Sequence, residues 1–465
     1  MFDTICALVP NDPDYPERTR RLDILTRALE GRLYDVLPHA FHEERGAGGE
    51  YIPLRRRRPS VRWPMAKIVV DDSLSLVFGE GHFPTIESSD ARSRALLGDI
   101  ARESRLNQTM LEAALRGSVG SVAVLLRVLG GRVYFRVLPS MFLTPVWQAD
   151  APDELARVTE RYKVNGRQLR EQGYEIDDPA SEFWFQREWD ADGETWFVPC
   201  PVADGWPREI DAGRSVRHGM GFVPIVWIRN LPGGDDIDGD CTFRAGLATN
   251  VEIDYQLSQA GRGLKYSSDP TLLIREPAGV DNEMVRGAGN ALVVSEKGDA
   301  KLLEIGGTAA NAVIEYVRFL REIALEGVHG NRASAERLAA PQSGRALEMM
   351  NQGLIWLADN LRVSYGDALL RLAHMLVRVS ALYPLRVRGE AVAPLDAGAR
   401  LSLHWPPWYP ADAVERQSDA GTLATLTAGG LLSRETAVKS LADSYDIEDV
   451  AAELARIGRA AGGKA

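Results

Sequence analysis

The sequence predicts an α+β fold with more than one domain. Its 465 residues, 45% of them hydrophobic and 26% charged, are ordinary for a folded chain and enough for several domains. Helical repeats come early and short alternating segments follow, an order typical of helices segregated from antiparallel strands. A later block then places a helix, a small β-rich insert, a second helix and a much longer helix in succession.

The overall charge argues against a free-standing nucleic-acid binder. The formal net charge is -11 and the pI about 5.3, whereas such binders usually carry a basic excess that neutralises phosphates. Brief contact with DNA stays compatible with this charge. Cys6, Cys200 and Cys241 are far apart and form no CxxC pair, so we expect a reducing compartment, without a disulfide framework or a thiolate zinc site. No signal peptide and no membrane span are expected.

The first half of the chain supplies the α+β pattern. We expect helices over Pro16–Leu37 and Ser89–Leu115, and a strand over Met65–Phe78. A hairpin with a glycine turn follows the second helix. The strands expected after that helix are Val119–Val128, Val133–Val137, Met141–Trp147, Glu160–Val164, Phe183–Trp189, Thr195–Pro199 and Val223–Ile228.

The densest basic run consists of four adjacent residues, Arg55, Arg56, Arg57 and Arg58. Such a run can bind the phosphates of a nucleic acid. It can also be a solvated loop or a patch that faces a partner protein, so we treat it as a candidate basic patch.

The segment Leu231–Asp240 is a linker by composition. Its aspartates suggest a calcium loop, but Cys241 and Leu247 stand where that motif needs glycine and glutamate. We therefore expect Asp236, Asp238 and Asp240 to cap the helix that follows, because a helix N-terminus favours negative charge. The alternative is a magnesium centre of a nuclease built on the same acids.

The later block contains two helices around a β-rich insert. The first helix, Phe243–Leu264, has one side formed by Leu247, Val251, Asp254 and Ser258. The insert, Pro270–Ile305, is too small for a core of its own, so we expect neighbouring copies to cover it. The second helix, Thr308–Glu326, carries an apolar stripe of Val313, Tyr316, Val317, Leu320 and Ala324. After a polar, glycine-punctuated loop, the repeat of a long helix comprises Leu347, Met350, Leu354, Leu357, Leu361 and Leu372.

The C-terminal end predicts extended segments and then short helices. The segments Tyr383–Pro394 and Ala399–Trp405 are expected to be extended. A helix over Val414–Ala428 ends at a glycine pair, and Ser433 caps a second helix. The third helix is expected to be capped by Asp446, with Asp449 three residues further on.

This order of parts resembles the portal proteins of tailed double-stranded-DNA bacteriophages, of the type found in long-tailed siphoviruses. The stretch FRAGLATNVEIDYQLSQAGRG, from Phe243 to Gly263, resembles the first stem helix of a portal. The stretch AAPQSGRAL, from Ala339 to Leu347, resembles the segment that opens the long helix after the tunnel loop. The ending resembles the portal pattern too, with HWPP at residues 404–407 and GLLSRETA at residues 430–437.

The resemblance implies the division of the chain. It implies an α+β wing at residues 1–242, a descending stem helix at 243–264, a β-rich clip at 265–307, a returning stem helix at 308–327, a tunnel loop at 328–343, a long wing helix with an extended segment at 344–409 and a helical crown at 410–465.

The resemblance also implies the role and the partners. A homo-oligomeric ring, usually a dodecamer, would sit at one capsid vertex of the virion after synthesis in the host cytoplasm, and double-stranded DNA would pass through it during packaging and ejection. The major capsid protein, the large terminase subunit and head–tail connector proteins would bind it. The implied tunnel-loop residues are Asn331, Arg332, Ser334, Glu336 and Arg337. The implied channel-lining residues of the stem are Glu315, Arg318, Glu322 and Glu326.

No pattern predicts an enzyme. The sequence contains no Walker-type loop, no GxSxG and no HExxH, and its histidines are scattered. We expect no catalytic residues, no metal and no cofactor. The alternatives are another head-completion or ring-forming adaptor protein without a portal channel, and a metal-dependent hydrolase.

Overall fold

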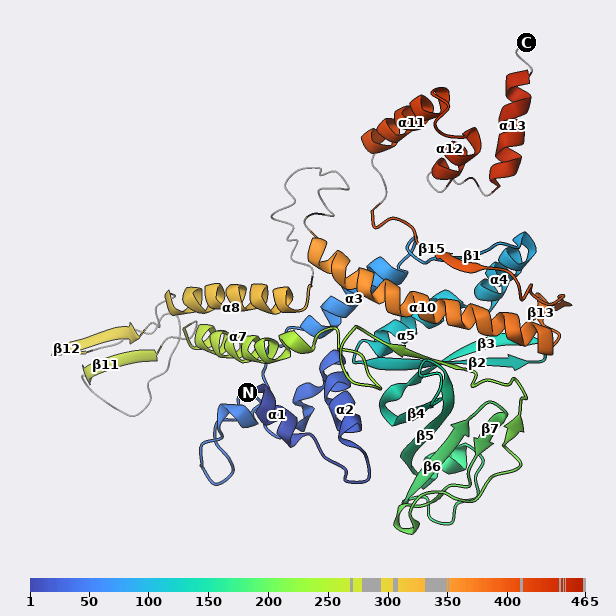
Figure 1. Cartoon of the computed structure of the whole chain (residues 1–465). Coiled ribbons are helices and arrows are strands. Elements are labelled where there is room, and N and C mark those ends of the chain that lie inside the picture. Colours follow the sequence, from blue (N-terminus) through green and yellow to red (C-terminus); the bar gives the residue numbers. More distant parts are fainter. Residues whose placement is uncertain are drawn as a thin grey trace. The chain divides into compact units, whose positions relative to one another are not determined.

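The computed structural model describes residues 1–267, 271–277, 294–303, 308–330, 349, 351–409, 413–442, 445, 447 and 449–462. These residues fall into two compact units, which we call the body and the C-terminal unit. The body holds the described residues up to 330 together with 352–406, and the C-terminal unit holds the others. The body mixes helices with antiparallel strands, which confirms the α+β class (Figure 1).

The first part of the body is helical. Helix α3 is the segment that we expected as a strand, so that prediction was wrong. Its buried face is broad and leaves few polar residues between the apolar ones, which makes the period of three to four residues hard to recognise in the sequence. The first expected helix ends early, before Gly31 (φ 72°), and the second is divided at Arg105 (φ 55°). The elements are α1 (Phe2–Leu8), α2 (Glu17–Leu29), η1 (Leu33–Val36), η2 (Leu54–Arg56), α3 (Met65–Phe78), α4 (Ala91–Glu103) and α5 (Leu106–Gly117).

Two antiparallel sheets follow, in the region expected to be rich in strands. One has the order β10-β2-β3 and is contacted by α5 and α10; the other has the order β4-β5-β6-β7-β9, with β8 on β6. Leu125, Val158 and Trp189 belong to one buried cluster that joins the two sheets. The elements are β2 (Ser121–Leu129), β3 (Arg132–Pro139), η3 (Ser140–Phe142), β4 (Leu143–Trp147), β5 (Leu155–Asn165), α6 (Gly166–Glu171), β6 (Glu182–Trp189), β7 (Gly193–Trp196), β8 (Cys200–Pro201), η4 (Val202–Asp204), β9 (Val216–Arg217) and β10 (Ile225–Arg229).

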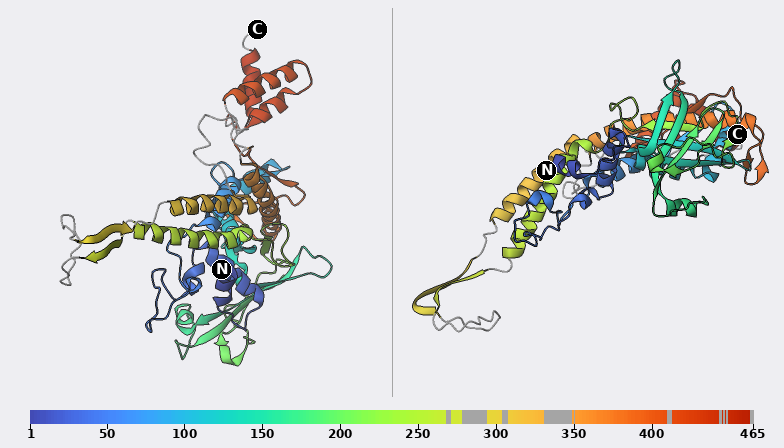
Figure 2. Two further views of the ribbon diagram at one scale, coloured as in Figure 1. Left: turned by 90° about the vertical axis from the view of Figure 1, so that its left-hand side faces the viewer. Right: turned by 90° about the horizontal axis from the view of Figure 1, so that it is seen from below.

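The next elements are η5 (Arg244–Gly246), α7 (Leu247–Ser267), the ribbon of β11 (Thr271–Pro277) and β12 (Val294–Leu303), and α8 (Thr308–Gly327). We use the word stem for the pair α7 and α8 as a label only. Figures 1 and 2 show α7 and α8 side by side, with the ribbon at the end of the pair. The two strands are antiparallel, with Thr271 opposite Leu303. The helix–insert–helix order expected from the sequence is therefore present.

Helix α10 (Gln352–Leu382) is the long helix, and its 31 residues cross the three-stranded sheet. Tyr365 at its middle is fully buried and donates a hydrogen bond to Asn230 Oδ1 (3.2 Å). A Cβ atom at Gly117 would lie 2.3 Å from the Tyr365 hydroxyl oxygen, so Tyr365 can take this buried position because residue 117 has no side chain. After α10, the chain forms β13 (Arg386–Val387), β14 (Glu390–Ala391) and β15 (Leu401–His404), and β15 pairs with β1 (Thr85–Ser88).

The C-terminal unit contains three helices, α11 (Ala413–Ala428), α12 (Arg434–Leu441) and α13 (Val450–Gly462). Ser433 caps α12 as expected, because its Oγ accepts a hydrogen bond from the Thr436 N–H (3.1 Å). The cap expected at Asp446 lies outside the described residues. The Asp449 carboxylate accepts a hydrogen bond from the Ala452 N–H (2.9 Å), in the first turn of α13.

Candidate functional site

Helix α8 packs on α7 through one side only. Val313, Val317 and Leu320 are half-buried and Ala324 is fully buried, so this part of the predicted stripe is confirmed. Tyr316 is 47% exposed, and its assignment to the packed stripe was wrong. A helix turns by about 100° per residue, which takes Tyr316 away from the side that faces α7.

A second apolar stripe on α8 is exposed. Its large members are Tyr316, Phe319 and Ile323, with exposed fractions of 47%, 58% and 44%, and exposed Ala312 extends it by one turn. The successive spacings of four, three and four residues place all four on one side of the helix. Single exposed apolar residues are normal, whereas a contiguous exposed row is typical of an interaction surface. We call these four residues the α8 stripe; the sequence prediction missed it by placing Tyr316 on the packed side.

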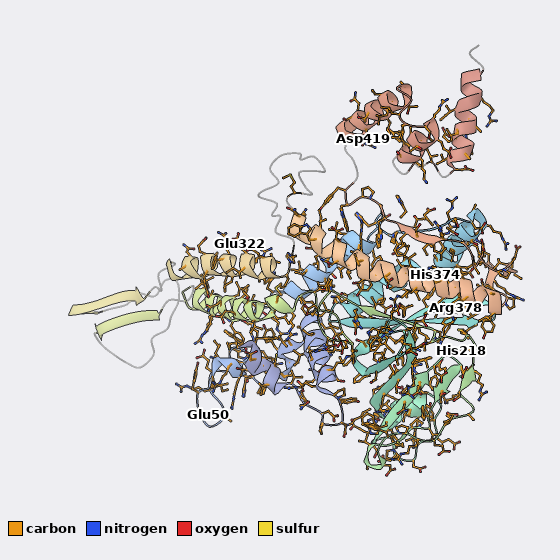
Figure 3. The ribbon with its side chains drawn as sticks, in the orientation of Figure 1. Glu50, His218, Glu322, His374, Arg378 and Asp419 are labelled. Atoms are coloured by element: carbon orange, nitrogen blue, oxygen red, sulfur yellow. The ribbon has the colours of Figure 1, made fainter. Side chains whose placement is uncertain are left out.

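A charged face borders the α8 stripe. Glu315, Arg318, Glu322 and Glu326 are all exposed, as expected from the sequence. Figure 3 shows Glu322 on the side of α8 that faces away from α7. Arg318 donates a hydrogen bond to Glu315 (2.9 Å), but both side chains are about 70% exposed, so the pair adds little stability. With three glutamates and one arginine, this face is acidic. Its position along the wall of a channel remains a prediction.

Helix α7 is held firmly at its root. Its predicted side is buried throughout: Leu247, Val251, Asp254 and Ser258 are 1–3% exposed. The Asp254 carboxylate accepts hydrogen bonds from the Tyr34 hydroxyl (2.6 Å) and the Trp63 N–H (2.7 Å). Burial raises the pKa of Asp254 from 3.8 to about 6, although these two hydrogen bonds and the charge of Arg62 lower it. An acid is therefore buried where the stem meets the rest of the body.

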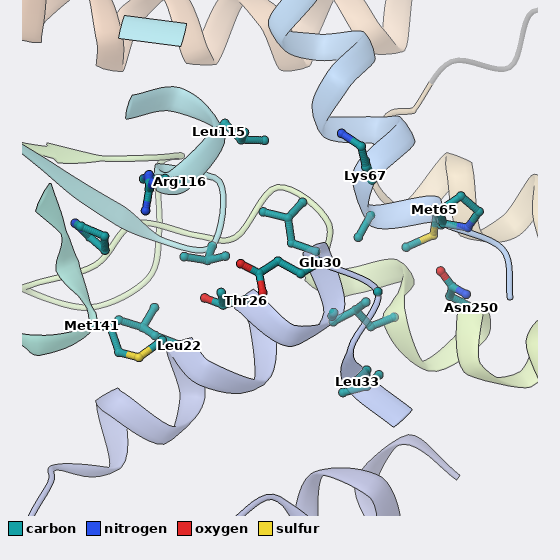
Figure 4. A pocket seen from close by; sticks show the side chains of 18 of the residues that line it. Leu22, Thr26, Glu30, Leu33, Met65, Lys67, Leu115, Arg116, Met141 and Asn250 are labelled. Atoms are coloured by element: carbon teal, nitrogen blue, oxygen red, sulfur yellow. The ribbon is translucent and has the colours of Figure 1, made fainter. Parts of the chain in front are cut away.

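The hollow shown in Figure 4 lies beside this root. It has a volume of about 1090 Å³ and is bordered by residues of α2, α3, α5 and α7. Leu33 and Met65 contribute apolar walls, while Thr26, Glu30 and Asn250 contribute polar groups. The hollow is therefore lined by η1 and by the same side of the stem root that carries Val251 and Asp254.

The four arginines do not form one basic patch. Arg55 and Arg56 are exposed and Arg58 is half-buried, but Arg57 is only 1% exposed. The Arg57 guanidinium donates hydrogen bonds to the Phe41 carbonyl (3.1 Å) and the Tyr51 hydroxyl (3.2 Å). Its role in the structure is to hold the loop before it, so the hypothesis of a four-residue patch was wrong.

The linker acids form ion pairs with α2 instead of capping a helix, so the cap prediction was wrong for Asp238. The Asp238 carboxylate is 2% exposed and accepts two hydrogen bonds from Arg18 (2.7 and 2.8 Å) and one from Arg21 (2.7 Å). Asp235 also pairs with Arg21 (2.7 Å). Burial alone would raise the pKa of Asp235, but hydrogen bonds from the Asp238 and Ile237 N–H groups, together with Arg21, lower it to about 2. We call Arg18, Arg21, Asp235 and Asp238 the α2 clasp.

Gly330, the last described residue before the rest of the predicted tunnel loop, is held by neighbouring residues. The Gly330 N–H donates a hydrogen bond to the Leu325 carbonyl (2.8 Å), and a Cβ atom at Gly330 would lie 3.1 Å from Val69 of α3. The residues named for the tunnel loop itself lie outside the described residues: Asn331, Arg332, Ser334, Glu336 and Arg337.

Within the described part of the chain, no three or more His, Cys, Asp or Glu side chains gather closely enough to hold a metal ion. The described residues also include no helix with the length and apolarity needed to cross a membrane.

Comparisons with known proteins give a weak likeness. No family model matches the chain, and no curated protein matches it. Two solved structures are similar to it: the virion of a native gene transfer agent (GTA) particle, and the neck of an empty GTA particle computed with C6 symmetry. Each match has 16% identity and a TM-score of 0.39 over 80% of this chain, and covers 89% and 86% of the matched chains, respectively. This TM-score is too low for the likeness to carry an argument about function.

Proposed function

We propose that the chain is the subunit of a portal-type ring that conducts double-stranded DNA through one vertex of a phage capsid. The observation that carries this proposal is the pairing of two surfaces on α8, the exposed α8 stripe and the acidic face beside it. In a ring, each α8 stripe would be covered by the next subunit. The acidic face would then be free to turn toward the lumen, where it would repel DNA and let it slide.

The stem suits a conduit wall in its dimensions. Helix α8 has 20 residues, and a helix of this length spans about 30 Å. Because α7 is buried at its root, the body can hold each copy of the pair at a fixed angle. In this proposal the ribbon of β11 and β12 offers strand edges to the terminase or to connector proteins, other surfaces meet the capsid protein, and the chain conducts rather than catalyses.

A charge placed in the α8 stripe should abolish the ring. We expect the purified wild-type chain to give a very large particle by light scattering after size exclusion, and a ring with a central hole in negative stain. The substitution Phe319→Glu should release smaller species, because burying a carboxylate without a partner costs several kcal/mol at each interface. The control Asn311→Glu adds the same charge to an exposed residue nearer the acidic face and should leave the ring intact.

Two results would decide against this function. A wild-type chain that stays a discrete monomer and cleaves DNA with magnesium would favour a metal-dependent hydrolase. A ring without a hole wide enough for duplex DNA would favour an adaptor.

Reversing the acidic face should turn a repulsive wall into a binding wall. The variant Glu315→Lys/Glu322→Lys/Glu326→Lys is expected to retain duplex DNA, with an affinity that falls steeply as salt is raised, whereas wild-type rings should not retain it. Fluorescence anisotropy on assembled rings measures this. Equal DNA affinity of both rings would show that this face does not meet DNA.

A further inference from the structure

The described residues of the C-terminal unit form almost no core of their own. Among its described side chains, only Ala442 is buried. The larger apolar residues of its three helices, such as Leu426, Leu441 and Ile457, are half-buried. A unit this small with so little buried apolar surface needs another surface to be stable.

Leu431 projects from this unit. Helix α11 ends at Ala428, and Gly430 (φ 69°) turns the chain away from it, while the Leu431 N–H donates a hydrogen bond to the Leu426 carbonyl (3.0 Å). In such a helix ending, the apolar residue after the glycine usually folds back on the last turn. Leu431 is instead 80% exposed, the largest exposed fraction among the large apolar residues of the described chain.

The same unit holds an apolar hollow of about 660 Å³ between α12 and α13. Its lining combines apolar side chains with a charged rim of Asp449, Glu453 and Arg456, in which Glu453 pairs with Arg456 (2.9 Å). The apolar members are Val438, Leu441, Tyr445, Ile447 and Ile457.

We propose that Leu431 of one copy inserts into the α12–α13 hollow of the next copy, so that the C-terminal units form a second, head-to-tail contact around the ring. The projection and the hollow are different surfaces of one chain, so the contact can repeat from copy to copy. The series of copies closes into a ring when the rotation between neighbours divides a full turn evenly. The charges also favour a second copy as the partner, because the exposed Arg434, three residues after Leu431, would approach Asp449 of the next copy. The inference rests on the proposed ring and adds a contact that the stem does not supply.

Paired cysteines test the contact directly. In the full-length chain, Leu431→Cys with Val438→Cys should give a ladder of disulfide-linked multimers on oxidation. Leu431→Cys with Glu435→Cys, where position 435 is exposed and outside the hollow, should give no ladder beyond that of the wild-type cysteines.

A charge substitution gives a second measurement. Leu431→Asp should weaken assembly about tenfold or more per interface, read from the concentration at which rings dissociate. Thr422→Asp, an exposed site two turns earlier on α11, should leave that concentration unchanged. Rings that show neither a ladder nor a shift with Leu431→Asp would overturn this contact and leave the portal proposal standing. Absence of rings from the wild-type chain would overturn both.

Discussion

Replacing Asp238 with asparagine is expected to lower the free energy of unfolding of the body by about 3–5 kcal/mol, the usual cost of removing one partner from a buried ion pair. The Asp238 carboxylate is 2% exposed and receives hydrogen bonds from Arg18, Arg21 and the Ser121 hydroxyl. An amide in its place would keep the shape, but it would leave the Arg18 guanidinium, 13% exposed, without its countercharge. The loss should appear in calorimetry as a lower melting temperature of the body.

The neighbouring Asp236 supplies the matched control. It lies two residues away in the same linker and is exposed, so Asp236→Asn should change stability by no more than about 0.5 kcal/mol. Equal melting temperatures for the two variants would mean that the α2 clasp does not hold the body together.

A pH effect between about pH 4 and pH 6 is expected at Asp254. Burial raises its pKa to about 6, above the value of about 3.9 for an unfolded aspartate, so between these values the folded chain binds more protons here than the unfolded chain. Stability must then fall as pH rises. The contribution of Asp254 is fully present below about pH 4 and is lost as pH passes through about 6, a total of about 2–3 kcal/mol.

The variant Asp254→Asn isolates this effect. Its amide oxygen can still accept the hydrogen bond from the Trp63 N–H, but the amide does not titrate. Its stability relative to wild type should therefore rise by about 2–3 kcal/mol from pH 4 to neutral pH in denaturant titrations. Asp35→Asn, at an exposed aspartate of η1, should follow the wild-type profile. Parallel profiles for wild type and Asp254→Asn would refute the assignment.

The sequence predicted those elements whose pattern is local. The long helix α10 and the first stem helix have clear one-sided repeats, and the side of α7 that includes Val251 and Asp254 is buried as expected. Helix α3 was taken for a strand because its buried face is broad, so that few polar residues remain to mark the helical period. The break at Arg105 carries neither glycine nor proline, the residues that usually mark such a turn.

Contacts between distant segments could not be predicted. Asp238 pairs with Arg18 across 220 residues, and nothing near either residue indicates the partner. Arg57 is one of four adjacent arginines that look alike in the sequence, yet it alone is buried, with its guanidinium against the Phe41 ring. The α8 stripe could have been predicted, because the spacing of Tyr316, Phe319 and Ile323 in the sequence places them on one side of a helix.

If the chain assembles into the proposed ring, the α8 stripe also limits how long a free subunit stays usable. Until a neighbour covers Phe319 and its companions, each newly made chain presents an adhesive surface to any other exposed apolar surface in the cell. Synthesis that outpaces ring closure should therefore send chains into irregular aggregates rather than into a reserve of ready subunits. The yield of well-formed rings should depend on how fast the chain is produced as well as on how much is made.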